Sequence, residues 1–191
     1  MNPLRGPSAA LAAMAERYKP LPIPAMARHL PLVLRAALFI LIAPASIAGW
    51  LPWYISGWAR PHLDSALGVV GAVFAVFGWL VLLWCARDFA VRGRGTPAPY
   101  DPPRQLVVDG LYRFVRNPMY VALVVSLLGQ AAMYRSRSVL WYAAIVAIGF
   151  HLRVIAYEEP KLTELFGESY ADYRRRVPRW IPRVALGGRR R

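Results

Sequence analysis

Four long apolar stretches, at residues 32–55, 66–86, 118–134 and 139–157, dominate the chain. A helix needs about 20 apolar residues to cross a hydrocarbon layer about 30 Å thick, and the third stretch is on the short side of that length. Only residues 135–138 separate the last two stretches, and helices joined so closely form an antiparallel hairpin. The pattern predicts an all-α, polytopic membrane protein with about four transmembrane helices and further helices near its C-terminus.

Small residues recur along the second stretch, where Gly71, Ala75 and Gly78 lie on roughly one face. Small side chains let membrane helices approach closely, so this face is expected to contact another helix. In the first stretch, we expect the helix to bend at three residues that disturb helical hydrogen bonding or loosen the backbone, namely Pro44, Gly49 and Pro52.

Charge gives these helices an orientation. The chain is 57% hydrophobic and carries a formal net charge of +14, a combination typical of apolar spans flanked by basic loops. Nucleic-acid binding would also explain the charge, but the arginines stand at the ends of apolar stretches and do not line one face. Basic residues gather before the first stretch, between the second and third, and after the fourth. The positive-inside rule therefore places both termini and the middle segment in the cytoplasm.

We expect one membrane domain over residues 32–191, preceded by an N-terminal tail at residues 1–31. The polar segments 87–117 and 158–183 are expected to form a cap at the cytoplasmic ends of the helices. Four prolines between residues 97 and 103 rule out regular helix in the middle of the first segment. Gly167 divides the second segment into two helical stretches, and its arginine-rich end indicates attraction to anionic membrane lipid.

The first polar group that could carry chemistry stands where the third stretch begins. Asn117 followed by Pro118 is typical of an N-cap and the first position of a helix. Such a helix end is partially positive, and Arg113 and Arg116 beside it would help to hold a carboxylate or phosphate. Tyr120 lies one turn beyond Arg116 and can share its face. The alternative is that both arginines only reach toward lipid head groups.

The second polar group closes the fourth stretch, and the hairpin brings it to the same membrane level as the first. Glu158 and Glu159 are acids at a helix C-terminus, where the helix dipole disfavours negative charge. They form either a cation site or ion pairs with the arginines of the first group. His151 stands seven residues before Glu158 and should share its face, whereas Arg153 should point elsewhere. Both are functional candidates because they are polar within a span, although simple solvation also explains Arg153.

Positive donors beside a carboxylate pair suit a zwitterionic ligand such as S-adenosylmethionine, and a phosphate-bearing cofactor would use the arginines equally well. No metal is expected, because the three histidines are far apart in sequence and Cys85 is the single cysteine. The sequence predicts no oligomeric state.

Residues 95–120 and 157–182 together resemble the isoprenylcysteine carboxyl methyltransferase family in order and spacing. The family's motif is R-H-P-x-Y-x-G, and R-N-P-M-Y in this chain matches it at Arg116, Pro118 and Tyr120. Asn117 replaces the histidine, Ala122 replaces the glycine, and the pair at 158–159 matches the family's acidic residues. The broader group includes phospholipid N-methyltransferases and a branch of reductases that use a nicotinamide cofactor.

This resemblance implies an S-adenosylmethionine-dependent methyltransferase of the bacterial inner membrane. Its acceptor would be a lipophilic molecule drawn from the bilayer, an isoprenylcysteine-type carboxylate or a similar small molecule. A phospholipid, amine or thiol acceptor, a nicotinamide-dependent reductase and a non-catalytic accessory protein remain alternatives. The residues expected to bind the cofactor are Tyr112, Arg113, Asn117, Pro118, Tyr120, His151, Glu158, Glu159, Tyr170 and Tyr173.

Catalytic roles are expected for Arg116, Arg153 and Glu159. With a carboxylate acceptor, either arginine could hold the nucleophile and no general base is required. With an amine or a thiol acceptor, Glu159 or Tyr120 could take up the proton.

Overall fold

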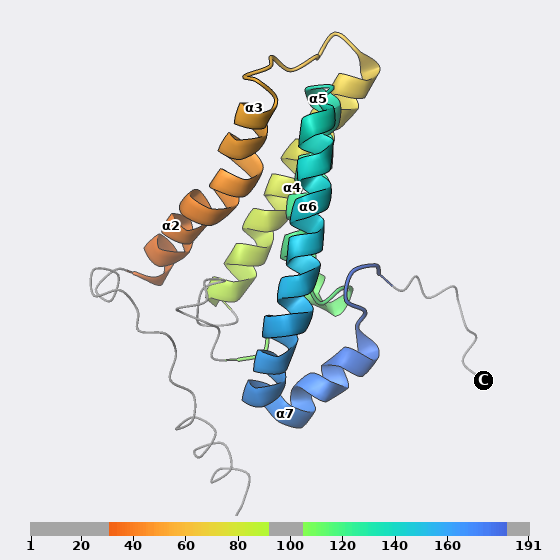
Figure 1. The fold of residues 1–191 in the computed structure, drawn as a ribbon. Coiled ribbons are helices and arrows are strands. Elements are labelled where there is room, and N and C mark those ends of the chain that lie inside the picture. The colour runs from red at the N-terminus through yellow and green to blue at the C-terminus, as the bar shows by residue number, and fades with distance from the viewer. Residues whose placement is uncertain (1–30, 92–104, 183–191) are drawn as a thin grey trace, which may run out of the picture.

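The computed structural model of the protein describes residues 31–91 and 105–182, and every regular element in these two ranges is helical (Figure 1). The elements in chain order are α2 (Leu32–Ala45), η2 (Ser46–Trp50), α3 (Leu51–Ile55), α4 (Ala66–Val91), η3 (Gly110–Arg113), α5 (Pro118–Met133), α6 (Arg137–Arg153), η4 (Val154–Glu158) and α7 (Glu159–Arg176). The all-α prediction is confirmed for these ranges. The predicted N-terminal tail and the proline cluster between 97 and 103 lie outside them.

Two helices among the described residues are long and apolar enough to cross a membrane, at Ala66–Phe89 and Arg137–Arg176. The second is α6 continued through η4 into α7. The apolar helices at Leu41–Ile55 and Pro118–Met133 are shorter. Large apolar side chains on the outside of the bundle are widely exposed, as Trp141 is at 71%, and such surfaces suit contact with lipid. These features support a membrane protein, and the number of spans stays a prediction.

Helices α4 and α5 form the closest contact of the bundle, along the face of small residues that the sequence predicts. A Cβ atom added at Gly71 would lie 2.5 Å from the carbonyl oxygen of Gly129, and one added at Gly78 would lie 2.5 Å from that of Ala122. The two backbones therefore touch, and only glycine fits at these positions. The predicted helix–helix contact is confirmed.

The first apolar stretch is interrupted by the π-helical turn η2, which contains Gly49 and follows Pro44. A π turn leaves carbonyl groups without their usual helical partners. Two side chains from the neighbouring helices compensate: Gln130 Nε2 donates to the carbonyl of Ala48 at 2.6 Å, and the Tyr142 hydroxyl donates to that of Ile47 at 3.0 Å. The expected irregularity of the first apolar stretch is therefore present, and side-chain hydrogen bonds connect it to α5 and α6.

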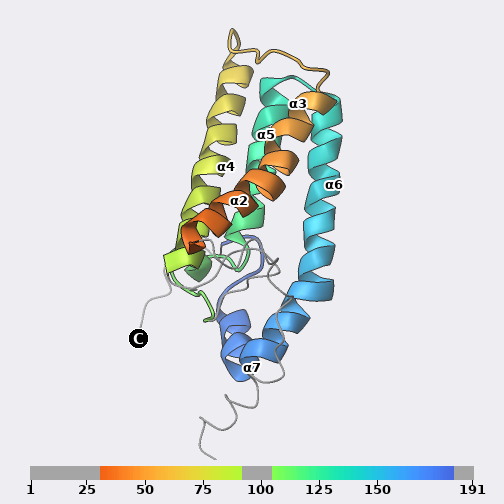
Figure 2. The same cartoon turned by 90° about the vertical axis from the view of Figure 1, so that its left-hand side faces the viewer.

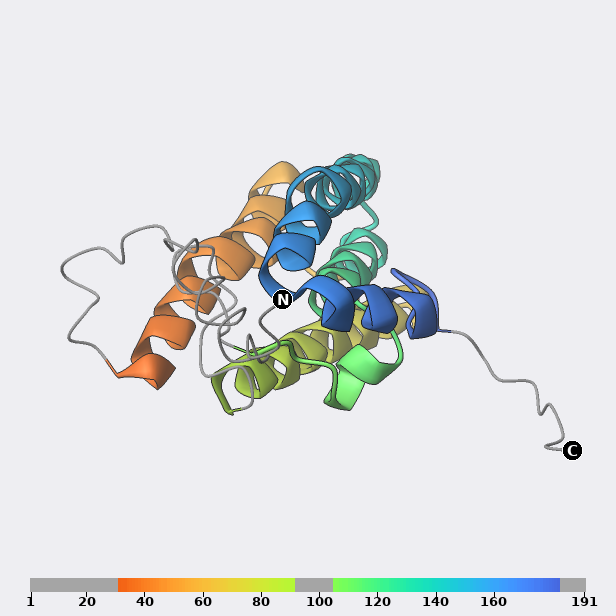
Figure 3. The ribbon, with the colours of Figure 1, turned by 90° about the horizontal axis from the view of Figure 1, so that it is seen from below.

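The two ends of the bundle differ (Figures 1 and 2). At one end, the loop between α3 and α4 lies beside the short turn between α5 and α6, and His62 N donates to the carbonyl of Met133 at 2.9 Å. That turn makes α5 and α6 the antiparallel hairpin that the sequence predicts. At the other end, α7 bends away from α6 and lies across the base of the bundle next to η3 (Figure 3). Within α7, Gly167 has a φ of 51° and separates two helical stretches, as predicted.

Candidate functional site

The π-helical turn η4 separates the partners of the two adjacent glutamates. The hydrogen bonds of a π turn join residues that are five apart in sequence, so residues five apart can share a face, which they do not in an α-helix. Arg153 Nε accordingly lies 2.9 Å from Glu158 Oε1. The expectation that Arg153 points away from Glu158 is wrong, because it assumed α-helical spacing through this turn.

Glu158 is also the acceptor for the Tyr120 hydroxyl, and Arg153 Nε donates to the same hydroxyl at 3.1 Å. The three side chains form a polar triad that joins the start of α5 to the end of α6. The Tyr120 ring stacks on that of Phe150 with 4.4 Å between ring centroids. The triad therefore has an apolar wall on one side.

Glu159 faces a second, more positive cluster. Its Oε1 lies 3.0 Å from Arg116 Nη1, and Arg179 donates to both carboxylate oxygens, at 2.6 and 2.9 Å. Arg174 lies 3.9 Å from Oε2. Burial opposes the charge of this carboxylate, but the hydrogen bonds of Arg179 and the nearby positive charges outweigh it and lower the pKa of Glu159. The two glutamates thus make separate ion pairs. Of the two alternatives left open by the sequence, the structure shows an ion pair with an arginine of the first group, Arg116.

Residues 177–180, which follow α7, form an irregular strap that crosses the site. Backbone and side-chain groups of the first polar group are bonded to it: Arg116 N donates to the carbonyl of Pro178 at 2.9 Å, and Asn117 Nδ2 donates to that of Arg179 at 3.2 Å. Asn117 stands at the N-cap position as predicted, but its side chain makes no capping hydrogen bond. The capping role is wrong because the amide is used to hold the strap.

The strap also reaches the end of α6. The indole Nε1 of Trp180 donates to His151 Nδ1 at 3.2 Å. A cavity of about 350 Å³ opens beside this pair, and Tyr120 and Phe150 line it as well. His151 is therefore turned toward Trp180 and this cavity, and Glu158 toward Tyr120 and Arg153.

Tyrosines fix α7 and the turn before α5 to each other. Tyr173 donates through its hydroxyl to the carbonyl of Tyr112 at 2.6 Å, and Arg116 Nη1 donates to the Tyr170 hydroxyl at 3.4 Å. Burial raises the pKa of Tyr170 and Tyr173, which keeps both hydroxyls protonated. Both tyrosines pack in an apolar cluster with Val177, so their position is well determined.

The structure thus brings together most of the expected site residues in two adjoining groups. The first contains Arg116, Glu159 and Tyr170 with their partners, and the second contains Tyr120, Arg153 and Glu158. Pro118 begins α5 at their edge. Arg113 lies apart, with its guanidinium 4.6 Å from the centre of the Phe114 ring.

Sequence reasoning missed Arg179 and Trp180 as members of the site. Both belong to the V-P-R-W-I-P segment within the second region of resemblance. That segment was available as a signal, but nothing in its apolar pattern indicated that it folds back onto Glu159 and His151.

The structure defines a helical bundle with membrane-type helices and a polar, arginine-rich site at one end. The sequence matches the phospholipid methyltransferase family over residues 67–169, which is more than half of the chain. The chain belongs to this family of membrane methyltransferases, and the resemblance noted from its motifs is confirmed.

Several proteins of known name are similar to it. The cobalt-zinc-cadmium resistance protein CzcN of Cupriavidus metallidurans is 35% identical over 132 residues, 68% of this chain and 53% of that protein. The protein-S-isoprenylcysteine O-methyltransferase of Schizosaccharomyces pombe is 35% identical over 79 residues, 41% of this chain and 34% of that protein. Methanethiol S-methyltransferase 1 of Bradyrhizobium diazoefficiens is 30% identical over 145 residues, 76% and 42% of the two chains. The chain spans roughly half, or less, of each of these relatives.

Proposed function

We propose that the chain is an integral-membrane, S-adenosylmethionine-dependent methyltransferase that acts on a lipophilic acceptor. The observation that carries the proposal is the meeting of the two halves of the family motif. Arg116 lies just before α5, and Tyr120 lies in its first turn. Glu158 ends η4 and Glu159 begins α7, and the fold brings these two acids within hydrogen-bonding distance of Tyr120 and Arg116. Two of the relatives are named as methyltransferases of a prenylcysteine and of methanethiol.

The charges around Glu159 fit a cofactor that carries a carboxylate. Arg116, Arg174 and Arg179 surround this single acid, so the cluster keeps a positive excess. The Nε atom of Arg116 is buried and has no hydrogen-bond partner among the described residues. An arginine with a spare donor in a desolvated place is suited to a second carboxylate. When bound, S-adenosylmethionine would supply an electrophilic methyl group on its sulfonium.

The residues of the chain would then act by positioning and proton transfer. Arg116 and Arg179 hold the cofactor's carboxylate, and Arg153 holds a carboxylate acceptor beside it. Orienting the two reactants is expected to supply most of the rate. For a thiol or amine acceptor, the Tyr120 hydroxyl would take up the proton while passing its own to Glu158. The lowered pKa of Glu159 makes that carboxylate a weak base.

For the membrane topology, we propose that all four apolar helical stretches cross the bilayer. The end that carries α7 and the strap would then face the cytoplasm together with both termini, as the distribution of basic residues requires. An inner-membrane location follows if the host is a bacterium. Cysteine accessibility tests this arrangement: a cysteine placed at Glu168 should react with an impermeant reagent only from the cytoplasmic side.

The deciding experiment is transfer of a radiolabelled methyl group from S-adenosylmethionine in membranes that contain the chain. A prenylcysteine, a phospholipid and a thiol are offered in turn, and membranes carrying Arg116→Ala serve as the control. Label in an extractable acceptor with the parent and its loss with the variant would support the proposal. Absence of label from every acceptor would contradict it.

A binding experiment separates the rival functions. A reductase on the same scaffold would be stabilised against heat by NADPH and not by S-adenosylmethionine. A non-catalytic accessory protein would bind neither in calorimetry. Binding of S-adenosylhomocysteine by the parent, but far more weakly by Glu159→Ala, would favour the methyltransferase.

A further inference from the structure

Four aromatic side chains, which we call the aromatic cluster, pack on one another at the end of the bundle opposite α7. Trp50 ends η2, and Trp53 and Tyr54 belong to α3. Trp58 lies in the loop between α3 and α4, which Figure 1 shows at the end of the bundle away from α7. The rings of Trp50 and Tyr54 are stacked with 5.4 Å between their centroids. The Trp58 ring joins all of them, because it is nearly perpendicular to these two rings and to that of Trp53, whose centroid is 4.4 Å away.

The backbone adopts an uncommon conformation where it places the Trp58 ring. Gly57 and Trp58 both have positive φ angles, of 74° and 61°, and a bulky side chain disfavours that conformation. Hydrogen bonds hold the turn: Trp58 N donates to the carbonyl of Trp53 at 3.1 Å, and the Ser56 hydroxyl donates to the same carbonyl at 2.6 Å. Ala59 N donates to the Ser56 hydroxyl at 3.3 Å. The turn therefore returns Trp58 to α3 in spite of the local strain.

Packing within the aromatic cluster does not bury its rings. Each of the four residues is between 43% and 54% exposed. Among the described residues, none of the three indole N–H groups of the cluster finds an acceptor in the protein. Rings with an apolar body and a polar atom that needs a partner are typical of the membrane–water interface. An external partner therefore explains the strained turn better than the packing of the bundle does.

The aromatic cluster lies between an apolar surface and a basic one. Exposed apolar side chains cover the helices that lead to it, as Ile42 does on α2. Beyond it, exposed arginines stand in the two segments that close this end of the bundle: Arg60 in the α3–α4 loop, and Arg135 and Arg137 at the α5–α6 turn beside that loop (Figures 1 and 2). Asp64 is the single acid of these segments. Guanidinium groups bind phosphate well, so the order from apolar to aromatic to basic matches the layers of a phospholipid surface.

We propose that the aromatic cluster binds the head-group layer of the phospholipid bilayer and fixes the depth of this end of the bundle. Its indole N–H groups and the nearby guanidinium groups would donate to phosphate and ester oxygens, and the ring bodies would lie where the acyl chains begin. The inference rests on the proposed membrane location and is independent of methyl transfer, so it goes beyond the proposed function. A soluble protein is a less suitable occupant, because the apolar helix surface that lipid would cover leads directly to the rings.

Thermal unfolding in detergent and in nanodiscs of phosphatidylcholine tests the proposal. Lipid that binds the folded protein stabilises it, so the parent should unfold at a higher temperature in nanodiscs than in dodecyl maltoside. Trp58→Gly removes the ring that joins the other three, and glycine adopts the left-handed conformation without strain. This variant should be as stable as the parent in detergent but lose about half of the gain in nanodiscs. Trp50→Leu combined with Trp53→Leu leaves the turn unchanged and should lose a similar share, whereas a full gain in both variants would overturn the proposal.

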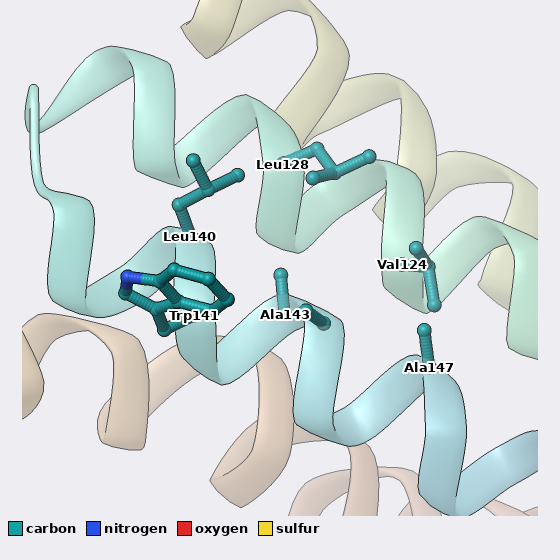
Figure 4. A pocket seen from close by; sticks show the side chains of 7 residues that line it. Val124, Leu128, Leu140, Trp141, Ala143 and Ala147 are labelled. Atoms are coloured by element: carbon teal, nitrogen blue, oxygen red, sulfur yellow. The ribbon is translucent and has the colours of Figure 1, made fainter.

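Trp141 provides the control for removal of an exposed tryptophan. It is 71% exposed and stands one turn inside α6, where it lines a cavity of about 290 Å³ between α5 and α6 (Figure 4). The other lining residues are all apolar, which places this ring at the level of the acyl chains. Trp141→Leu should therefore keep the gain of the parent in nanodiscs. Equal losses in Trp141→Leu and Trp58→Gly would show that the aromatic cluster has no role of its own.

A depth measurement separates a lipid partner from a soluble one. A nitroxide label is attached at Leu63→Cys, at an exposed position of the α3–α4 loop, and the buried Cys85 should not react. The collision rates of the label with oxygen and with a water-soluble nickel complex give its depth in vesicles of phosphatidylcholine. The label should lie in the head-group layer, and Trp58→Gly should change its depth. A label in free water would favour a soluble partner and contradict the proposal, as would an unchanged depth in the variant.

Discussion

Arg116 Nη1 lies 3.0 Å from Glu159 Oε1, and only 10% of the arginine side chain and 8% of the glutamate side chain are exposed. The two residues are 43 positions apart in sequence, and the α5–α6 hairpin brings them together. Neither partner has ready access to water. We therefore expect the pair to contribute both to the folding stability of the cap and to binding of the proposed cofactor.

The first prediction concerns the removal of the buried acid. Glu159→Gln leaves Arg116 and Arg179 without their shared counter-charge, and an uncompensated buried charge costs about 3 kcal/mol. Unfolding in detergent, followed by denaturant titration, should show a loss of that order. Glu164→Gln is the control, because the pair of Glu164 with Lys161 is solvent-exposed and contributes less than about 1 kcal/mol. Equal effects of the two variants would show that the Glu159 pairs are as well solvated as a surface pair.

The second prediction follows from the lowered pKa of Glu159. A carboxylate whose folded pKa lies below its ordinary value of 4.5 contributes stability that is fully present above that value. This stability is lost as the pH falls through the folded pKa. The parent should therefore lose more thermal stability than Glu159→Gln between pH 7 and the acid range below about 4.5. Parallel pH profiles for the two proteins would contradict the ion pairs described at this residue.

The third prediction concerns the residue that sequence reasoning missed. Arg179→Gln removes two charge-assisted hydrogen bonds to Glu159 and one positive charge from the proposed cofactor site. Affinity for S-adenosylhomocysteine should fall roughly tenfold or more, since hydrogen bonds to charged groups contribute about 1.5–3 kcal/mol. Calorimetry on the purified protein measures this. Arg175→Gln, at an arginine that pairs with Asp172 and is 69% exposed, should bind as the parent does.

The fourth prediction concerns the contact between α4 and α5. Gly78→Ala would place a Cβ atom 2.5 Å from the carbonyl oxygen of Ala122, so the helices must separate. We expect a destabilisation of about 1–3 kcal/mol, the usual cost of overpacking. Gly149→Ala provides a matched comparison, because a Cβ there meets nothing within 4 Å. That variant should be neutral or slightly stabilising in the same unfolding experiment.

The sequence predicted the helical architecture well because the main features of long apolar helices follow from simple local rules. Their length, the small residues at Gly71 and Gly78 and the short turn after Tyr134 each follow from one local rule. The hairpin then required the polar groups around Arg116 and Glu159 to meet, and the structure shows that they do. No longer-range information was needed for this part of the site.

The predictions that were wrong depend on backbone geometry, which the residue types alone do not reveal. The π turn at Val154–Glu158 changes which residues share a face, so the expected direction of Arg153 was wrong. Asn117 has the residue type of a cap, but its amide binds a strap that arrives from 62 positions away. Contacts between distant segments of this kind are decided by the fold as a whole.

The turn η4 also makes this junction depend on its π geometry. If the same five residues were wound as regular α-helix, everything after them would rotate by about 100°. Glu159 would then leave the Arg116 cluster, and α7 and the strap would turn away from α5. Deleting one of the five residues would instead let regular α-helix run through with the later faces kept, because residues four apart in an α-helix share a face as residues five apart do in a π turn.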